Sequence, residues 1–362
     1  MAVPDEPILF TGFPGFIGER LLPRLLERRP GAVFVCVVQP SFAAAAARSV
    51  AGIEAMHPHA RGRLRLVAGD ITLPDLGLAG DDALLRSLVG AYHLAAVYDL
   101  AVRRDVGIRV NVEGTRNVLR LLARAPRMER LHYVSTAYVS GTATGTFRET
   151  DLDVGQGFKN FYEETKFLAE VEVARSGLPC TIYRPAIVVG DSRTGETAKF
   201  DGPYFTLAAM EKIPSPGMFM KVGRGRNPAN LVPVDFIIDA MAALSDPSAA
   251  ASATYHLTDP APLSVGGVAR LLAQEMGKSF AFVPVPLTVA RALFRPQAVQ
   301  RYFGMPVQTL DYFDHPCRYD TAQATAALAA AGIHCPPFPS YVREMVAFYR
   351  SHHDAVRRSA MA

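Results

Sequence analysis

Three glycines near the start of the chain constrain its fold more than any other feature. Residues 7–11 (PILFT) have the composition of a β-strand, and residues 16–28 place apolar side chains at helical spacing. Between them lie Gly12, Gly15 and Gly18, one glycine at every third position. A strand, a glycine loop of this spacing and a helix are typical of the βαβ unit that binds a dinucleotide, whereas a plain glycine-rich turn is the alternative.

Each residue of this loop has a defined task in such a unit. Gly12 permits the tight turn, Gly15 lets the backbone approach a pyrophosphate, and Gly18 lets the helix pack on the sheet. The helix begins at Phe16 and Ile17, where free N–H groups and a partial positive charge favour phosphate. We therefore expect these five residues to bind the cofactor.

The first two thirds of the chain alternate short apolar runs with helical patterns, as βαβ units do. The continuously apolar run at 32–38 (AVFVCVV) is typical of a parallel strand that is covered on both faces. We predict an α/β fold, a doubly wound parallel sheet of the Rossmann type. Strands are expected at 7–11, 32–38, 64–68, 92–95, 130–134 and 181–189, and helices at 16–28, 110–124 and 162–176.

The pattern changes from about residue 194, where glycine and proline become frequent. We expect residues 1–193 to form the dinucleotide-binding domain and residues 194–362 to form mainly a smaller substrate-binding region. Segments at about 225–260 are expected to return to the first domain. Helices are predicted at 263–276, at 287–302 apart from Pro296, and at 341–352.

The end of the second expected strand bears on cofactor choice. It reads Val38-Gln39-Pro40-Ser41 and carries no acid that would bind a ribose 2′-hydroxyl and repel a 2′-phosphate. The nearest downstream arginine is Arg48. The pattern favours NADP(H) over NAD(H).

Two pairs of polar residues suggest chemistry. Tyr162 and Lys166 stand at i and i+4 and would share a helix face, although this spacing also occurs by chance in amphipathic helices. A lysine ammonium lowers the pKa of a neighbouring phenol from about 10, so that it can exchange a proton with a substrate oxygen. Ser135 and Thr136 follow the strand at 130–134, at the edge where open α/β sheets bind ligands. One hydroxyl there could bind a reacting carbonyl, and a polar strand cap is the alternative.

Composition excludes several other classes of protein. The net charge is only +4 and no long basic block is present, so nucleic-acid binding has little support. No apolar run approaches the roughly 20 residues that span a bilayer, and the N-terminus lacks the pattern of a signal peptide. His315, Cys317, His334 and Cys335 fit no standard metal spacing, so no metal is expected. We expect a cytoplasmic protein, with peripheral membrane contact left open.

Seven motifs together identify a family. They are TGFPGFIG at 11–18, GDIT at 69–72, HLAA at 93–96, NVEGTRNVL at 111–119, VSTAYVSG at 134–141, YEETK at 162–166 and YRPAIVVGD at 183–191. Over about the first 260 residues the chain resembles the extended short-chain dehydrogenase/reductases, which are NAD-dependent epimerase/dehydratase-like. Only the pair Phe13-Pro14 departs from the small residue that is usual in the first loop.

The resemblance implies roles residue by residue. It implies that Asn111, Thr136, Tyr162 and Lys166 are catalytic, with Ser135 as the neighbour of the catalytic threonine. Besides the glycine loop, the cofactor contacts that it implies are Asp70, Ile71, Ala95, Ala96, Tyr162, Lys166 and Pro185.

The motifs at 69–78, 190–205 and 230–240 are most similar to the fatty-acyl/thioester reductase branch, whereas LSVGGVARLLAQEMGK at 263–278 resembles epimerase and hydroxysteroid dehydrogenase relatives. The leading hypothesis is reduction of a lipid-like acyl thioester to an aldehyde, with the acyl group on CoA or a carrier protein. The alternatives are a ketone/secondary-alcohol oxidoreductase on a steroid-like or long-chain lipid, a sugar-nucleotide epimerase and a non-enzymatic NAD(P)-binding regulator. A homodimer is left open.

Two further features concern the substrate. Arg224 and Arg226 could bind the phosphate of a thioester carrier, although a solvated basic loop is the simpler interpretation. A run of Met and aromatic residues could line a wide apolar pocket, although many of them would be core; they are Phe200, Tyr204, Phe205, Met210, Met218, Phe219 and Met220.

Overall fold

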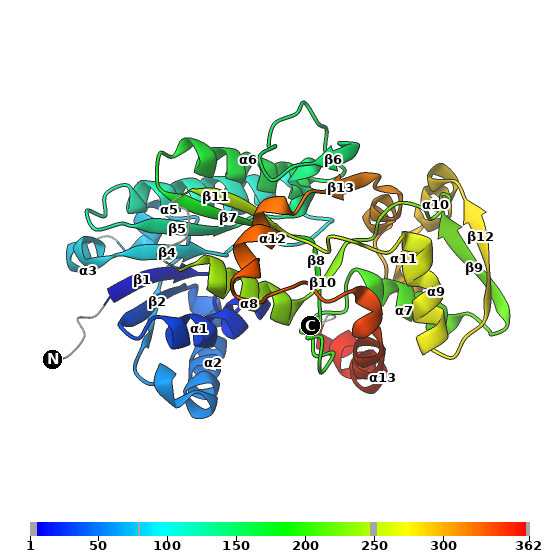
Figure 1. The fold of residues 1–362 in the computed structure, drawn as a ribbon, viewed down its shortest axis with the longest axis horizontal. Helices are drawn as coiled ribbons and strands as arrows, with labels where there is room; N and C mark the ends of the chain where they lie inside the picture. Colours follow the sequence, from blue (N-terminus) through cyan, green and yellow to red (C-terminus); the bar gives the residue numbers. More distant parts are fainter. Residues whose placement is uncertain (1–5, 79, 247–251, 360–362) are drawn as a thin grey trace.

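The computed structural model describes residues 6–78, 80–246 and 252–359. A seven-stranded sheet with strand order β11-β7-β5-β4-β1-β2-β3 forms its centre, and every neighbouring pair is parallel (Figure 1). The doubly wound α/β fold is therefore confirmed. The strands are β1 (Glu6–Thr11), β2 (Ala32–Val38), β3 (Leu64–Ala68), β4 (Gly90–His93), β5 (Arg130–Val134), β7 (Cys180–Pro185) and β11 (Ala253–Leu257).

Helices cover both faces of the sheet, because its central strands are apolar on both sides. All seven residues of β2 are buried. One hydrophobic core joins the sheet to α1, α2, α8 and α12, and a second joins its other face to α3, α5 and α6. The helices of these two layers are α1 (Phe16–Arg28), α2 (Ala43–Met56), α3 (Asp82–Ser87), α4 (Arg104–Gly107), α5 (Gly114–Leu122), α6 (Phe161–Arg175), α8 (Val234–Leu244) and α12 (Ala322–Ala329).

The sequence expectations differ from the structure at two places in this layer. The strand expected at 181–189 is interrupted at Ala186, so that β7 is followed by a separate strand, β8 (Ile187–Val189), which pairs with β10 (Leu231–Pro233). The helix expected at 110–124 begins as a π-helical turn, Ile108–Glu113, before α5. Such turns change the direction of side chains, and this one contains Asn111.

Most of the remaining elements lie at one end of the molecule, whereas β6 and β13 lie beside α6 (Figure 1). The prediction of one helix at 287–302 is wrong. Pro296 lacks the N–H that a continuous helix needs, and it stands instead at the N-cap of the second of two helices. Two short parallel strand pairs were not predicted, and the helix expected at 341–352 extends to residue 359. These elements are β6 (Gly145–Phe147), α7 (Pro203–Lys212), β9 (Gly217–Val222), α9 (Val265–Glu275), β12 (Phe280–Val285), α10 (Leu287–Phe294), α11 (Gln297–Phe303), β13 (Cys317–Tyr319) and α13 (Val342–Ser359).

Several segments of the second half return to the central sheet. Helix α8 packs on α1, and β11 pairs with β7. The buried carboxylate of Glu149 accepts backbone hydrogen bonds from His256 (2.9 Å), Gln323 (2.6 Å) and Ala324 (3.0 Å), which fastens β11 and α12 to the loop before α6. These contacts join β11 and α12 to the central sheet, while the return expected for 225–260 stays a prediction. The division into domains at residue 193 stays a prediction.

Among the described residues, no helix is both long and apolar enough to cross a membrane.

Candidate active site

A cavity of about 530 Å³ opens at the carboxyl edge of the sheet, where the ends of β1, β4, β5 and β7 meet the C-terminal elements. Its wall brings together most of the predicted site residues. Those that line it are Gly12, Gly15, Phe16, Ile17, Gly18, Ala96, Ser135, Thr136, Tyr162, Lys166 and Pro185. Asp70, Ile71, Ala95 and Asn111 do not line it.

Gly15 and Gly18 of the glycine loop both lie close to the carbonyl oxygen of Gly12. Gly12 has a φ of +92°, and its carbonyl accepts a hydrogen bond from Gly15 N at 3.0 Å. A Cβ on Gly15 would lie 2.7 Å from Gly12 O, and one on Gly18 would lie 2.8 Å from the same atom. A side chain at Gly15 is therefore excluded by the loop itself, and not by a pyrophosphate alone as the sequence suggested.

The first turn of α1 is free to bind an anion. Within the described residues, no side chain caps this helix at Gly15. The N–H groups of its first turn have no acceptor within the helix, and the residues that carry them line the cavity. The turn thus fits the pyrophosphate of a dinucleotide.

Lys166 lies at the base of the cavity with its ammonium directed at β5. Its Nζ donates to Val134 O at 2.8 Å and to Tyr133 Oη at 3.0 Å. Burial lowers the pKa of Lys166 to about 7, and the negative charge of Glu170 opposes this shift.

Tyr162 and Thr136 lie side by side at the cavity wall. Burial raises the pKa of Tyr162, and a hydrogen bond with Thr136 opposes the rise. The expectation that Lys166 lowers the pKa of this phenol is wrong for the arrangement seen, because the ammonium binds Tyr133 and Val134 instead. The i,i+4 spacing placed both residues on one face but did not determine where the ammonium points.

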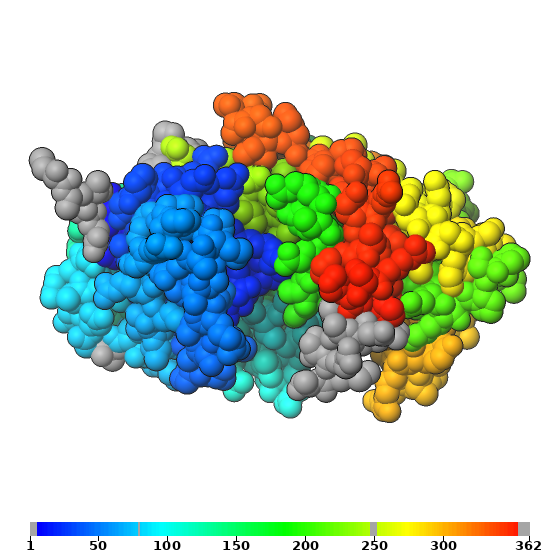
Figure 2. Space-filling model, turned by 90° about the horizontal axis from the view of Figure 1, so that it is seen from below, coloured from blue at the N-terminus to red at the C-terminus, as the bar shows by residue number. Residues whose placement is uncertain are grey.

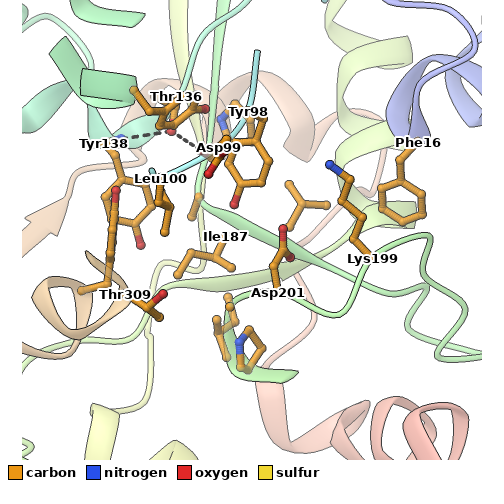
Figure 3. A pocket seen from close by; sticks show the side chains of 18 of the residues that line it. Phe16, Tyr98, Asp99, Leu100, Thr136, Tyr138, Ile187, Lys199, Asp201 and Thr309 are labelled. Atoms are coloured by element: carbon orange, nitrogen blue, oxygen red, sulfur yellow. Dashed lines mark hydrogen bonds between the residues drawn. The ribbon is translucent and has the colours of Figure 1, made fainter. Parts of the chain in front are cut away.

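The structure separates the roles of the two hydroxyls that follow β5. Ser135 Oγ donates to the Glu170 carboxylate, away from Tyr162. Thr136 Oγ1 accepts from Tyr138 N at 3.3 Å and lies within the cavity (Figure 3). Both residues line the cavity, but the Ser135 hydroxyl is engaged by Glu170, so the Thr136 hydroxyl is the candidate for binding a carbonyl.

A buried ion pair holds α6, the helix that carries Tyr162 and Lys166, and it was not predicted from the sequence. Glu170 accepts from Arg184 Nε at 2.9 Å and from Arg184 Nη2 at 2.6 Å. Both side chains are almost wholly buried. Glu170 stands four residues after Lys166, so the helical spacing that revealed the lysine could also have revealed this acid.

Asn111 acts on the neighbours of the site and not on the cavity. Its Oδ1 accepts from Val97 N at 2.8 Å, and its Nδ2 donates to Thr165 Oγ1 at 3.0 Å. The amide therefore ties the loop after β4 to α6, next to Tyr162. In the structure Asn111 is a positioning residue.

The remaining cofactor candidates do not line the cavity. Asp70 accepts from Gln39 Nε2 at 3.0 Å and from Thr72 N at 2.8 Å, so the end of β2 is joined to the end of β3. Ile71 packs against Gly114, and Ala95 N donates to Thr11 Oγ1 at 3.3 Å.

Several residues of the substrate side were not singled out from the sequence. Tyr98 packs edge to face on Tyr162 with ring centroids 5.1 Å apart. Figure 3 shows the Asp201 carboxyl directed into the cavity below Tyr98. Burial raises the pKa of Asp201 to about 6, and the charge of Lys199 opposes the rise. The other such residues are Asp99, Leu100, Tyr138, Ile187, Thr309, Tyr312 and Phe313.

The predicted run of Met and aromatic residues is mostly core. Of its seven members only Phe205 lines the cavity. Tyr204 and Met210 are buried in the C-terminal core, with Phe200 and Phe219 against it, and Met218 is exposed. The core interpretation of this run is therefore correct for most of it.

The segment after β8 lies against two distant helices, as Figure 2 shows for the green segment between the blue α1–α2 region and the red α13. Arg20 of α1 binds Glu196 at 2.8 Å, and a Cβ on Gly195 would lie 2.2 Å from Glu344 O of α13. This segment leads directly into Thr197, Lys199 and Asp201 of the cavity wall.

Within the described ranges, no group of three or more His, Cys, Asp or Glu side chains is placed to hold a metal ion.

A family model described as male sterility protein matches residues 10–241. The chain belongs to the male sterility protein family. Members of this family have an NAD(P)-binding domain of the extended short-chain dehydrogenase/reductase type, and the resemblance seen in the sequence is confirmed. The matched range contains the whole glycine loop and the Tyr162–Lys166 pair.

The relatives of this male sterility family chain include reductases and peptide synthetases. It is 26% identical to the fatty acyl-CoA reductase wat of Drosophila melanogaster over 66% of the chain and 54% of that protein. It is 32% identical to the isonitrile lipopeptide synthase of Streptomyces coeruleorubidus over 96% of the chain and 24% of that protein. The chain thus spans about half the length of the first relative and a quarter of the second.

Solved structures show the same fold. The crystal structure of the terminal R domain from the myxalamid PKS-NRPS biosynthetic pathway superposes with a TM-score of 0.79 and 25% identity, covering 98% of this chain and 92% of that one.

Proposed function

We propose that the chain is an NADP(H)-dependent reductase that converts a lipid-like acyl thioester into an aldehyde. The observation that carries the proposal is a single cavity that contains both an anion-binding glycine loop and the group Thr136, Tyr162 and Lys166. The fatty acyl-CoA reductase relative supports a thioester as the substrate.

Three residues of the cavity have separate roles in the proposed reaction. When bound, the dinucleotide supplies a hydride to the thioester carbonyl carbon. Tyr162 gives its proton to the carbonyl oxygen, and Thr136 donates a hydrogen bond to that oxygen while its negative charge develops. Lys166 holds the nicotinamide ribose. The hemithioacetal then releases its thiol and leaves the aldehyde.

The end of β2 supports NADP(H) as the cofactor. Gln39 is neutral, and its amide is held by Asp70, so the side chain that ends the strand does not repel a 2′-phosphate. Isothermal titration is expected to show NADPH binding at least as tightly as NADH. A clear preference for NADH would contradict this part of the proposal.

The lining of the cavity supports an apolar acyl chain. Its substrate side is mostly aliphatic and aromatic, with Asp99, Lys199 and Asp201 as its charged groups. A sugar nucleotide would need more polar partners than this wall offers. The acyl group is expected on CoA or a carrier protein. A homodimeric state and a cytoplasmic location stay predictions.

Product analysis tests the proposal. The purified chain is supplied with NADPH and, separately, with long-chain acyl thioesters, a keto-lipid and a UDP-sugar. We expect aldehyde only from the thioester, and activity confined to the keto-lipid would favour the secondary-alcohol oxidoreductase. Tyr162→Phe should abolish turnover while NADPH still binds, because the ring keeps its packing but loses the proton. Tyr302→Phe, at an exposed tyrosine on α11, is the matched control.

A further inference from the structure

Four cationic residues lie on the loop after β9 and on the helix α9 that it contacts. Lys221 lies near the end of β9, Arg224 and Arg226 are exposed and flank Gly225, and Arg270 lies on α9. A Cβ on Gly225 would lie 2.6 Å from Lys221 Cδ, and one on Gly266 would lie 3.5 Å from Lys221 Cδ and 3.7 Å from Arg270 Nη1. We call Lys221, Arg224, Arg226 and Arg270 the basic patch.

The basic patch has no internal charge partner. Across the described residues, none of its four side chains makes a hydrogen bond or an ion pair, whereas Arg24 binds Asp239 and Arg104 binds Glu164 elsewhere on the surface. The carboxylate that does lie against this loop is Asp314, which accepts from Asn227 Nδ2 at 2.8 Å. Four cations beside one engaged carboxylate leave the patch strongly positive.

The loop that presents the patch is fixed by its backbone. Gly266 N donates to Gly225 O at 2.9 Å, and Val265 N donates to Asn227 O at 2.9 Å. Gly267 N donates to Ser264 Oγ at 3.1 Å. The first N–H groups of α9 are therefore already satisfied, and the cationic side chains are the groups left to bind an anion.

The patch adjoins the cavity at its substrate side. Pro228 and Ala229, which follow Arg226, line the cavity, and so do Val265 and Ala269 next to the α9 residues just described. The loop and α9 lie at the end of the molecule away from β1–β3 (Figure 1), so the patch is remote from the strand end expected to receive the adenosine ribose.

We propose that the basic patch binds the phosphate of the pantetheine arm that carries the acyl thioester. The inference rests on the proposed function and assigns a second anion site to the same cavity. A phosphate at the far end of the arm would meet arginine and lysine, which bind phosphate by charge-assisted hydrogen bonds. The same phosphate ester is present in CoA and on a carrier protein.

Three substrates with one common acyl group test the site: the acyl-pantetheine, which has no phosphate, the acyl-4′-phosphopantetheine and the acyl-CoA. We expect kcat/KM to be at least about 10-fold higher for the acyl-4′-phosphopantetheine than for the acyl-pantetheine, because its KM is lower. A further gain with CoA would identify the nucleotide as part of the ligand. Equal rates for CoA and phosphopantetheine would identify the arm phosphate shared with carrier proteins.

Substitutions assign the effect to the patch. The double variant Arg224→Ala/Arg226→Ala should raise KM for the acyl-4′-phosphopantetheine to that of the acyl-pantetheine. Its kcat, and its rate on acyl-pantetheine, should stay unchanged. The matched control is Arg86→Ala, an exposed arginine of α3 at the opposite end of the molecule. Equal losses on both substrates, or an unchanged advantage in the double variant, would overturn the site.

Direct binding separates this inference from the proposed function. Titration with 4′-phosphopantetheine in the free thiol form needs no turnover, and the double variant should bind it at least about 10-fold more weakly. If the wild-type chain reduces acyl-pantetheine but does not prefer the phosphorylated arm, the function stands and the site is wrong. If no thioester yields aldehyde, the function is wrong, and the titration still decides whether the patch binds phosphate.

Discussion

Replacing Gly15 by alanine tests whether the glycine loop forms the cofactor site. The added Cβ would lie 2.7 Å from Gly12 O, a backbone atom that cannot rotate away as a side chain can. Gly12 O also accepts the hydrogen bond from Gly15 N at 3.0 Å, so the loop must open at its narrowest point. The N–H groups of the first turn of α1 then move away from the pyrophosphate.

The magnitude follows from the bonds that are displaced. A hydrogen bond to a charged group contributes about 1.5–3 kcal/mol, so losing two weakens binding by on the order of 3 kcal/mol. The dissociation constant for NADPH should rise by about 10²-fold. Isothermal titration measures this change, and urea unfolding shows whether Gly15→Ala still folds.

Gly52 provides the matched control. It lies inside α2, and a Cβ there would have no atom within 4 Å. Gly52→Ala should leave the NADPH affinity unchanged and stabilise the helix by up to about 1 kcal/mol. If Gly15→Ala binds NADPH within threefold of the wild type, the reasoning about the loop is refuted.

Three further predictions address the lysine, the ion pair and the acyl chain. Burial lowers the pKa of Lys166 to about 7, so its ammonium is present below that pH and is lost above it. The affinity for NADPH should therefore fall between pH 6 and pH 9. The variant Lys166→Met should remove this pH dependence. Arg184→Met leaves Glu170 buried without its partner and should lower the free energy of unfolding by about 3–5 kcal/mol in urea, whereas the double variant Glu170→Met/Arg184→Met should lose less. For acyl thioesters of increasing length, each buried CH₂ adds at most about 0.8 kcal/mol, or about fourfold in kcat/KM, and equal rates for short and long chains would reject a lipidic substrate.

The start of the sheet could be predicted closely because local and tertiary signals agree there. In α1 the apolar periodicity and the preceding glycines identify the same boundaries that the structure has. Strand β11 was missed, because its five residues gain their stability from pairing with β7, which lies about 70 residues earlier in the chain. The sequence suggested that a segment at about 225–260 returns to the first domain, but not which strand it pairs with.

The site was predictable as a set of residues but not as a set of contacts. Helical spacing and strand ends identified Thr136, Tyr162 and Lys166, and the structure brings all three to one wall. The sequence alone could not show that the Asn111 amide binds Val97 and Thr165, nor that the Lys166 ammonium binds β5. Those choices depend on which acceptors the neighbouring strands place within reach.

Helix α6 is bonded to its surroundings at three residues. These bonds explain how the position of Tyr162 can stay fixed when the loops on the opposite side of the cavity change. Lys166 is bonded to β5, Glu170 to Arg184 of β7, and Thr165 to Asn111. The proposed proton donor, Tyr162, therefore stands on a helix whose position is set by the sheet, as preorganised catalysis requires. The opposite wall is built from loops and short elements of the C-terminal half, where Asp201, Thr309 and Tyr312 lie. Changes in those loops can alter which acyl group fits without moving Tyr162, so substrate preference and proton transfer are separable properties of this cavity.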